Sequence, residues 1–358
     1  MNRGKRVALV GSVGVPAKYG GFETFAQELG PRLAQLGMQV IVTCDATQYA
    51  QRPREFKGCE LLWVPVRANG MPSTLHDGLA LLRTARRVDT ILIMGVSGGP
   101  FLPLIRLISR ARLVTNTDGV EWRRGKFGAV KRALLWVFDR LAQLASHAVV
   151  VDNAALTPFV LARRRRVTAV IPYGGDHAIQ GPATALPEEL AHTPYALTIC
   201  RIEPENNIEL LIRGFLASDC ERYVLVGNWQ VSPYARRLYE RYRSEPRLRL
   251  MSPIYDIARL KGLRAGCRAY LHGHSVGGTN PSLVEMLFFD VPILAFDCEF
   301  NRQTALDAAT YFAQADELAD KLRTVWDAPR PTAGAREAIR ARYTWDHVTE
   351  QYARLLAG

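Results

Sequence analysis

The stretch from Tyr270 to Glu285, YLHGHSVGGTNPSLVE, predicts more about the fold of this chain than any other. An apolar strand over 269–271 runs into a loop with two histidines and a glycine pair, and the loop enters a helix at Asn280-Pro281. Asn as the cap and Pro at the first helical position are typical of a helix start, where a fixed φ is welcome and a missing N–H costs little. The stretch therefore predicts a strand, a loop and a helix in succession.

The loop in this stretch has the composition of a phosphate-binding loop. Gly277 and Gly278 allow the backbone to approach a ligand closely, and the free amides of the first helical turn attract an anion. Glu285 follows just over one turn into the helix, where its carboxylate can accept hydrogen bonds from sugar hydroxyls. These residues predict a site for a nucleotide diphosphate that carries a sugar.

The same alternation of strands and helices extends along the whole chain, which indicates parallel sheets covered on both faces. Before residue 174, strands are expected at 6–10, 39–44, 60–65, 90–94, 113–116, 148–151 and 167–171, and helices at 22–36, 75–86, 129–144 and 154–161. After a linker expected at 174–194, strands are expected at 195–200, 223–226, 248–251, 269–271 and 292–295, and helices at 207–216, 233–243, 256–263, 281–288 and 316–325. The prediction is an α/β protein of two tandem doubly wound domains, 1–175 and 176–343, with ligands in the cleft between them.

Composition narrows the class of protein. With 358 residues, 48% of them apolar, the chain has the length and composition of a soluble protein with two domains. Six cysteines form no C-x-x-C pair, which favours a reduced, cytosolic chain. The opening MNRGKRVALVG has too short an apolar run for a signal peptide. The longest charge-free run, 90–105, is interrupted by glycines and prolines, so we expect no spanning helix.

The charge is unevenly distributed. Lys and Arg number 46 against 34 Asp and Glu, and the segment 101–170 alone holds 13 basic and 4 acidic residues. Such a segment suits nucleic acid, anionic lipid or a phosphorylated acceptor. A solvated basic surface is the alternative. Nucleic acid is disfavoured, because the chain contains no zinc-finger, RNP or basic-zipper pattern.

Two loops of the first half carry candidate site residues. GSVGVPAKYGGFE, 11–23, is not G-x-G-x-x-G, but Gly20 and Gly21 open a helix whose amides could hold part of a donor or acceptor; a tight turn is the alternative. In NTDGVEWRRGK, 116–126, Asp118 and Glu121 could orient hydroxyls or act as a base, and Trp122 could stack on a sugar ring. The acceptor residues expected there are Trp122, Arg123 and Lys126. A capped loop with solvated charges is the alternative.

The second half offers cationic groups rather than a metal site. Arg201 follows a strand, where a guanidinium can grip a diphosphate bidentately; an ordinary surface arginine is the alternative. His272 and His274 lack a third ligand at metal spacing, and the chain contains no D-x-D. The chain also contains no G-x-S-x-G, which disfavours a serine hydrolase. We therefore expect a site without metal or cofactor, in which a nucleotide-sugar is a co-substrate.

Together these motifs resemble the GT-B glycosyltransferases of family four, and more narrowly the bacterial rhamnosyltransferase-like subgroup of capsule, O-antigen and exopolysaccharide biosynthesis. The resemblance rests on VGSVGVPAKYGGFETF (10–25), TDGVEWRRGKF (117–127), RIEPENN (201–207) and HGHSVGGTNPSLVE (272–285). It implies two Rossmann-like domains, the first for the acceptor and the second for the nucleotide-sugar, with the last helix, 344–358, packing back on the first.

The resemblance also implies roles for single residues. Glu285 matches the second glutamate of the family's E-x7-E motif and would bind the ribose. Gly277 stands in place of the first glutamate, and Asn206 stands where many members carry the lysine that partners Arg201. The donor-binding residues implied are Gly20, Gly21, Arg201, Asn206, His274, Gly277, Gly278, Thr279, Asn280 and Glu285. The catalytic candidates remain Asp118 and Glu121 from the loop 116–126; on the family's mechanism, in which the leaving phosphate helps deprotonate the acceptor, Asp118 becomes a positioning group.

The resulting hypothesis is a retaining, metal-independent transferase that moves L-rhamnose from dTDP-L-rhamnose to a polyprenyl-diphosphate-linked saccharide. The protein would be cytoplasmic and bound peripherally to the inner face of the cell membrane. A helix with Val130, Leu134, Val137 and Leu141 on one face is expected to pack that face into the core; binding of the face to anionic lipid is the alternative. Other hypotheses are a UDP- or GDP-sugar donor, a non-catalytic nucleotide-sugar-binding subunit of an assembly complex and, more distantly, a nucleic-acid-binding protein.

Overall fold

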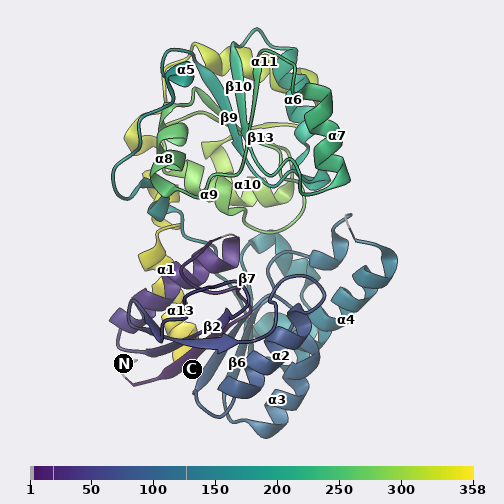
Figure 1. Cartoon of the computed structure of the whole chain (residues 1–358), viewed down its shortest axis with the longest axis vertical. Helices are drawn as coiled ribbons and strands as arrows, with labels where there is room; N and C mark the ends of the chain where they lie inside the picture. The colour runs from purple at the N-terminus through teal and green to yellow at the C-terminus, as the bar shows by residue number, and fades with distance from the viewer. Residues whose placement is uncertain (1–3, 19, 126) are drawn as a thin grey trace. The chain divides into compact units, whose positions relative to one another are not determined.

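The computed structural model describes residues 4–18, 20–125 and 127–358, which divide into two compact units (Figure 1). Unit 1 comprises Met1–Tyr173 and Trp345–Gly358, and unit 2 comprises Gly174–Thr344. The domain limits expected from the sequence, at 175 and 343, lie within two residues of this division.

Unit 1 is built on an eight-stranded sheet with the order β3-β4-β2-β1-β5-β6-β7-β8, parallel except that β3 pairs antiparallel with β4. Its strands are β1 (Arg6–Val10), β2 (Gln39–Asp45), β3 (Glu55–Phe56), β4 (Cys59–Val64), β5 (Thr90–Met94), β6 (Arg112–Asn116), β7 (Ala148–Val151) and β8 (Thr168–Val170). Its helices are α1 (Gly21–Gln35), α2 (Ser73–Thr84), α3 (Leu102–Ile108), α4 (Ala129–Ala145) and α13 (Trp345–Ala357), with 3-10 helices η1 (Gly99–Phe101), η2 (Glu121–Arg123), η3 (Ala154–Phe159) and η4 (Ala162–Val167).

Strand β1 shows why the central strands are apolar at consecutive positions. Val7 and Leu9 pack in one apolar cluster with residues of α1 and α13, whereas Ala8 and Val10 pack in another with residues of α2 and α3. Successive side chains of a strand point to opposite faces, so a strand between two helical layers buries all of them. This is the signal by which the sequence predicted the sheet.

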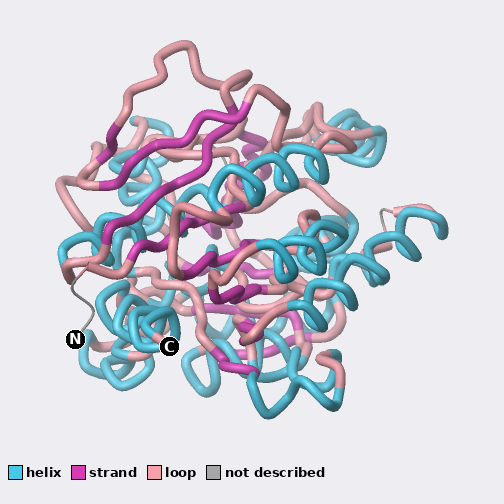
Figure 2. Tube along the Cα trace, turned by 90° about the horizontal axis from the view of Figure 1, so that it is seen from below, coloured by secondary structure: helices cyan, strands magenta, loops and turns pink. Residues whose placement is uncertain are grey.

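Unit 2 is built on a six-stranded sheet, parallel throughout, with the order β11-β10-β9-β12-β13-β14. Its strands are β9 (Tyr195–Ile199), β10 (Arg222–Val226), β11 (Leu248–Met251), β12 (Ala269–His272), β13 (Ile293–Phe296) and β14 (Thr310–Phe312). Its helices are α5 (Glu188–Ala191), α6 (Ile208–Leu216), α7 (Pro233–Tyr242), α8 (Ile257–Gly266), α9 (Pro281–Leu287), α10 (Glu299–Ala305), α11 (Ala315–Trp326) and α12 (Glu337–Ala341), with 3-10 helices η5 (Asp176–Ile179), η6 (Pro204–Asn206), η7 (Leu306–Ala308) and η8 (Ala333–Arg336). Strands (magenta in Figure 2) alternate with helices (cyan) along both units and form largely parallel sheets, which confirms the predicted α/β fold class.

The last helix, α13, belongs to unit 1 and lies beside α1 (Figure 1). Phe25 of α1 makes edge-on contacts with Trp345 and Tyr352, at centroid separations of 6.0 and 5.2 Å. Asn116 at the end of β6 donates from Nδ2 to the Tyr352 hydroxyl at 3.0 Å, and Thr90 donates to the Leu356 carbonyl at 2.9 Å. The chain therefore returns to close the core of its first unit.

Two sequence-based expectations about the fold were wrong. The segment 174–194 is not a linker, because it forms η5 and α5 and is fastened to α8: Thr184 N–H donates to the Ala258 carbonyl at 3.0 Å, and Lys261 donates to the Gly181 carbonyl at 2.6 Å. The residues 154–161 do not form an α-helix. They form the shorter 3-10 helix η3, in which Pro158 has no N–H to donate.

The expectation that the apolar face of α4 packs into the core was also wrong for three of its four residues; the fourth, Leu141, is half-buried. Val130, Leu134 and Val137 are all exposed, while the side chains that α4 buries include Asp139 and Gln143. None of the helices in the described part of the chain is long and apolar enough to cross a bilayer.

The closing contact of α13 predicts a large stability effect. Trp345 has 0% of its surface exposed, so Trp345→Ala should lower the free energy of unfolding by about 3–5 kcal/mol through lost burial and the cavity left behind. The measurement is urea unfolding followed by circular dichroism. The control is Asp346→Ala on the same helix, whose carboxylate is 88% exposed and pairs with Arg32 at 3.2 Å, so it should cost less than about 1 kcal/mol. Equal effects of the two substitutions would show that α13 contributes little to the core.

Candidate functional site

The loops that follow β9 and β12 lie together in unit 2, because these two strands are neighbours and end at the same edge of the sheet. Ser275, in the loop after β12, donates both its N–H and its hydroxyl to the Glu205 carbonyl, each at 2.9 Å. Asn207 donates from Nδ2 to the Gly273 carbonyl at 2.9 Å. The structure thus brings RIEPENN against HGHSVGG, two motifs that are about 70 residues apart in the sequence.

Asn206 connects these two loops through its side chain. Its Nδ2 donates to the Arg201 carbonyl at 2.6 Å, which turns its Oδ1 toward His274 Nδ1 at 2.8 Å. The imidazole nitrogen therefore carries the proton and donates it to the amide oxygen. A lysine, which the resemblance predicts at 206, has no acceptor for this hydrogen bond. Asn206 is a buried structural link, while the side chain of Arg201 is exposed at the end of β9.

Gly277 adopts a backbone conformation that a glutamate could adopt only with strain. Its φ is 137°, and a Cβ at this position would lie 3.0 Å from Nε2 of His274. The conformation of this loop therefore favours glycine at the position where the family that the motifs resemble carries its first glutamate. Gly278 and Thr279 are buried beside it, and Asn280 caps α9 as predicted, accepting from Ser282 N–H at 3.0 Å.

Glu285 lies on α9 between two basic residues, an arginine and a histidine, that the sequence did not reveal. His177 Nε2 is 3.3 Å from one carboxylate oxygen, and Arg264 donates from Nη2 to the other. These contacts use one lone pair on each oxygen, and a carboxylate oxygen has two. The Glu285 side chain is 13% exposed, so a ligand can reach it.

The charge state of Glu285 follows from these partners. Burial raises the pKa of its carboxyl, but the charge of Arg264 and the hydrogen bonds from Arg264 and His177 outweigh burial, so its pKa is lower than that of an ordinary glutamate. The group is ionised at neutral pH and accepts hydrogen bonds only. It is suited to a ligand that offers hydroxyl donors.

Arg264 and His177 are the functional residues that sequence reasoning missed. Arg264 follows Leu263 on α8 and is buried, a position at which the pattern alone predicts a core side chain. His177 lies in η5, inside the segment that was taken for a linker. The sequence signal that could have located His177 is the run YGGDH after an apolar strand, which resembles the polar loops at other strand ends.

His272, at the carboxyl end of β12, is buried and uncharged. Its ring lies 6.1 Å from the Tyr270 ring and 6.2 Å from that of His274, between ring centroids. Burial lowers the pKa of His272 to about 3, and among the described residues its Nε2 has no hydrogen-bond partner. A neutral imidazole beside the glycine loop adds no charge to the site at neutral pH.

In unit 1, two side chains of α1 hold the loop over 11–18. Glu23 accepts from Val13 N–H and Gln27 accepts from Ala17 N–H, both at 2.8 Å. Gly20, with φ 107°, precedes the helix, and a Cβ there would lie 2.1 Å from an oxygen of Glu23. The loop is therefore folded back on α1, and Gly21 begins that helix as predicted.

Asp118 lies where β6 ends and is held by α13 through one intermediate residue. Its φ is 58°, in the left-handed region, and its N–H donates to Oδ1 of Asn116 at 2.9 Å. The same Asn116 donates to Tyr352 of α13. Non-glycine residues in this conformation are uncommon and gather at functional sites. The carboxylate is half-buried, and its role as a base or positioning group stays a prediction.

The residues after Asp118 are engaged in contacts within unit 1. Glu121 pairs with the buried Arg124 at 2.7 Å. Trp122 donates from Nε1 to Asp139 of α4 at 3.1 Å, and its ring meets Phe159 edge-on. Arg123, the second predicted acceptor residue, places its guanidinium 5.2 Å from the Phe159 ring centre. The third, Lys126, lies outside the described residues.

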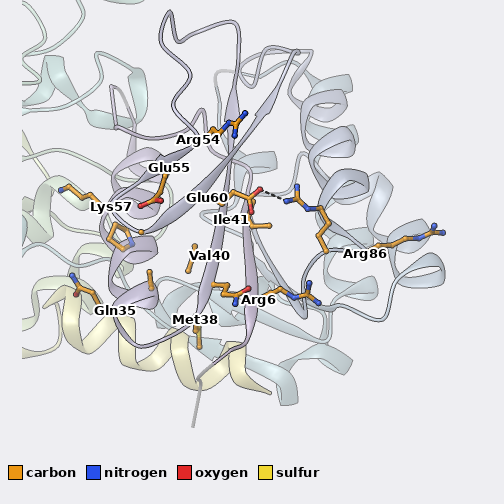
Figure 3. A pocket seen from close by; sticks show the side chains of 15 residues that line it. Arg6, Gln35, Met38, Val40, Ile41, Arg54, Glu55, Lys57, Glu60 and Arg86 are labelled. Atoms are coloured by element: carbon orange, nitrogen blue, oxygen red, sulfur yellow. Dashed lines mark hydrogen bonds and ion pairs between the residues drawn. The ribbon is translucent and has the colours of Figure 1, made fainter.

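A separate hollow of about 900 Å³ lies where the amino-terminal ends of the unit 1 strands are, opposite the carboxyl ends that carry the loops described above (Figure 3). It is lined by the amino-terminal ends of β1 and β2 and by the end of α1, including Arg6, Gln39 and Gln35. Its charged side chains are exposed, and Arg87 pairs with Glu60 across it at 2.6 Å. None of the predicted site residues lines it, so it is distinct from the strand-end loops described above.

The backbone at Gly277 predicts that restoring a glutamate will fail. Gly277→Glu should lower the free energy of unfolding by about 1–2 kcal/mol, because an L side chain is disfavoured at positive φ. Gly334→Glu is the control, at an exposed glycine of unit 2 with open space around its Cβ, and should change stability by less than about 0.5 kcal/mol. Chemical unfolding measures both. A Gly277→Glu protein as stable as the control would contradict the backbone argument.

The buried imidazole predicts a pH dependence with a definite sign. The folded protein keeps His272 neutral down to about pH 3, whereas the unfolded chain takes up a proton below its ordinary pKa of about 6.5. Protons therefore favour the unfolded chain, and stability falls as the pH drops below that value. His272→Gln should reduce the loss between pH 8 and pH 5 by about 2 kcal/mol in urea unfolding. His192→Gln, at an exposed histidine of unit 2, should leave the loss as in the wild type.

Comparison with known proteins places the fold among solved structures. A family model described as a domain of unknown function (DUF1972) matches residues 4–176, and no curated protein matches the chain. Sucrose-phosphate synthase from Thermosynechococcus elongatus matches with a TM-score of 0.82 and 18% identity over 98% of each chain. HepE of Anabaena in complex with UDP-glucose matches with a TM-score of 0.73 and 16% identity, over 98% of this chain and 99% of that chain. The catalytic domain of starch synthase IV from Arabidopsis thaliana, bound to ADP and acarbose, matches with a TM-score of 0.71 and 13% identity over 99% of each chain. Likeness at such identities shows the fold, and the chain has the GT-B fold that its motifs predicted.

Proposed function

We propose that the protein is a glycosyltransferase whose unit 2 holds a nucleotide diphosphate sugar. The observation that carries the proposal is the Glu285 carboxylate, kept ionised by Arg264 and His177 at the helix that follows the glycine loop. An ionised carboxylate with free lone pairs accepts hydrogen bonds from two adjacent hydroxyls, as a ribose presents them. The fixed partners hold it in one orientation before the ligand arrives.

The neighbouring loops supply the groups that a diphosphate needs. Arg201, exposed at the end of β9, can donate two parallel hydrogen bonds to phosphate oxygens. The backbone of Gly277 and Gly278 allows close approach of the same anion. On this basis we propose that the transfer is metal-independent, with the charge of the leaving diphosphate balanced by the guanidinium and the loop amides.

We propose a retaining reaction, as the family resemblance implies. The bond between sugar C1 and the diphosphate oxygen breaks, and a bond between C1 and the acceptor oxygen forms on the same face. The acceptor's proton passes to the leaving phosphate oxygen, so no enzymic nucleophile is needed. Asp118, held by Asn116, would position the acceptor hydroxyl.

The donor proposed is dTDP-L-rhamnose, on the strength of the subgroup motifs. HepE binds UDP-glucose and starch synthase IV binds ADP, so structures of the same fold accept different nucleotides. A UDP- or GDP-sugar is therefore the alternative donor. We propose a polyprenyl-diphosphate-linked saccharide as the acceptor, in bacterial surface polysaccharide synthesis at the inner face of the cell membrane; the basic segment 101–170 supports an anionic partner.

The test is thermal unfolding with dTDP, UDP, GDP and ADP, each beside its sugar conjugate. A ligand that binds only the folded protein stabilises it by about 2.7 kcal/mol at roughly 100 times its Kd. We expect the largest shift with dTDP-L-rhamnose, and we expect Glu285→Gln to lose most of it. Glu240→Gln is the matched control, because Glu240 is an exposed glutamate of unit 2 that forms a surface ion pair with Arg243.

Transfer to lipid-linked acceptor separates the catalytic hypothesis from a non-catalytic subunit. Radiolabelled sugar appearing in the lipid fraction, dependent on Glu285, would establish the transferase. Donor stabilisation without any transfer would favour a nucleotide-sugar-binding subunit of an assembly complex. A flat ligand panel with well-folded protein would refute the preformed donor site.

A further inference from the structure

Helix α4 directs its apolar side chains outward. Val130 is 77% exposed, Leu134 51%, Trp136 46% and Val137 41%, whereas Asp139 is 6% exposed. Val130, Leu134 and Val137 are spaced by four and three residues, so they lie on one stripe of the helix. Figure 1 shows α4 at the outer side of unit 1. This is the reverse of the usual arrangement, in which a surface helix buries its apolar stripe.

A buried polar network fixes α4 in this orientation. Asp139 accepts from Trp122 Nε1 at 3.1 Å and from Gln143 Nε2 at 2.8 Å, and Gln143 in turn accepts from Leu161 N–H at 2.8 Å. Rotating the helix to bury the apolar stripe would carry Asp139 away from Trp122 and Gln143 away from Leu161. The two bonds that tie α4 to its surroundings would break and leave buried polar groups without partners, at a cost of about 1–3 kcal/mol each. The exposed stripe is therefore the result of specific contacts on the opposite side.

Close backbone packing adds a second constraint on α4. A Cβ at Gly99 would lie 2.2 Å from the Phe138 carbonyl, so the helix approaches the start of η1 at van der Waals distance. Helix α3 packs against α4 and adds three exposed apolar side chains, Leu104 at 46%, Leu107 at 84% and Ile108 at 39%. The apolar side chains of α3 and α4 are called the α3–α4 face below.

The exposed charged side chains on α3 and α4 themselves are of one sign, and Arg106 of α3 is one of them. Lys131 and Arg132 lie in the first turns of α4 and are exposed. Within Ala129–Ala145, all of which the structure describes, Asp139 is the only acidic residue, and it is buried. The run Arg163–Arg166 begins beside the other end of the helix, where Arg164 donates to the Ser146 carbonyl. An apolar stripe is thus combined with an uncompensated positive field.

We propose that the α3–α4 face is a docking surface for a bilayer with anionic headgroups. Apolar side chains with basic neighbours and a tryptophan are the features by which a helix lies in a membrane interface. A second copy of the chain is disfavoured, because two such faces would bring like charges together. Nucleic acid would neutralise the charge but leave the apolar stripe in water. The inference rests on the proposed function for its purpose, since a lipid-linked acceptor is reached only at a membrane surface.

The test is co-sedimentation of the full chain with vesicles. Wild-type protein should bind vesicles of phosphatidylglycerol mixed with phosphatidylcholine more tightly, by about tenfold or more, than vesicles of phosphatidylcholine alone. The reason is that each basic residue near an anionic surface adds electrostatic attraction. Raising the salt concentration should weaken the binding. Leu134→Asp/Val137→Asp and Lys131→Glu/Arg132→Glu should each lower binding to the anionic vesicles by about tenfold or more.

The matched control is Leu75→Asp/Leu82→Asp, which places the same charges at two exposed leucines of α2 in the same unit and should bind as the wild type does. The melting temperature of every variant, measured by circular dichroism without ligand, shows that each one is folded, and the donor-induced shift is read separately. Vesicle binding that depends on the α3–α4 face supports the docking surface even where no donor shift is found, a result that would refute the proposed function alone.

Three results would overturn the docking proposal. The first is wild-type protein that binds neither vesicle. The second is equal binding by the wild type and by Leu134→Asp/Val137→Asp. The third is a concentration-dependent dimer in light scattering that this double substitution abolishes, which would assign the α3–α4 face to a second copy of the chain.

Discussion

Parallel pairing of buried strands is the constraint on which the rest of the structure depends. Because neighbouring parallel strands end at one edge, the loops after β9 and β12 meet although they are far apart in the sequence. Asn206 and His274, one from each loop, are joined by a hydrogen bond of 2.8 Å. In unit 1 the same rule gathers the loops after β1 and β6 on the carboxyl side of a second sheet.

Buried polar groups then select one arrangement among those that the apolar pattern allows. Burying such a group without a partner is costly, so each one fixes its neighbours. Arg264 and His177 fix the Glu285 carboxylate in unit 2, and Asp139 fixes the rotation of α4 in unit 1. The need of buried polar groups for partners therefore explains both the fixed charge at Glu285 and the exposed apolar stripe of α4.

The two departures from the family's pattern have local structural explanations. Gly277 has a positive φ that a glutamate would adopt only with strain, and Asn206 makes two hydrogen bonds of which a lysine could make only one. Both residues are integrated into the loops around them.

The sequence by itself determined the α/β class, the approximate limits of both units, the helix start at Asn280 and most strands, because apolar runs and caps are local signals. It misread 174–194 as a linker, since contacts with α8 leave no local pattern. Only the tertiary structure decided that Arg264 and His177 flank Glu285, that Asn116 joins Asp118 to α13, and that α4 turns its apolar stripe outward. Each of these depends on which distant side chains meet in the fold, and spacing along the chain does not encode such meetings.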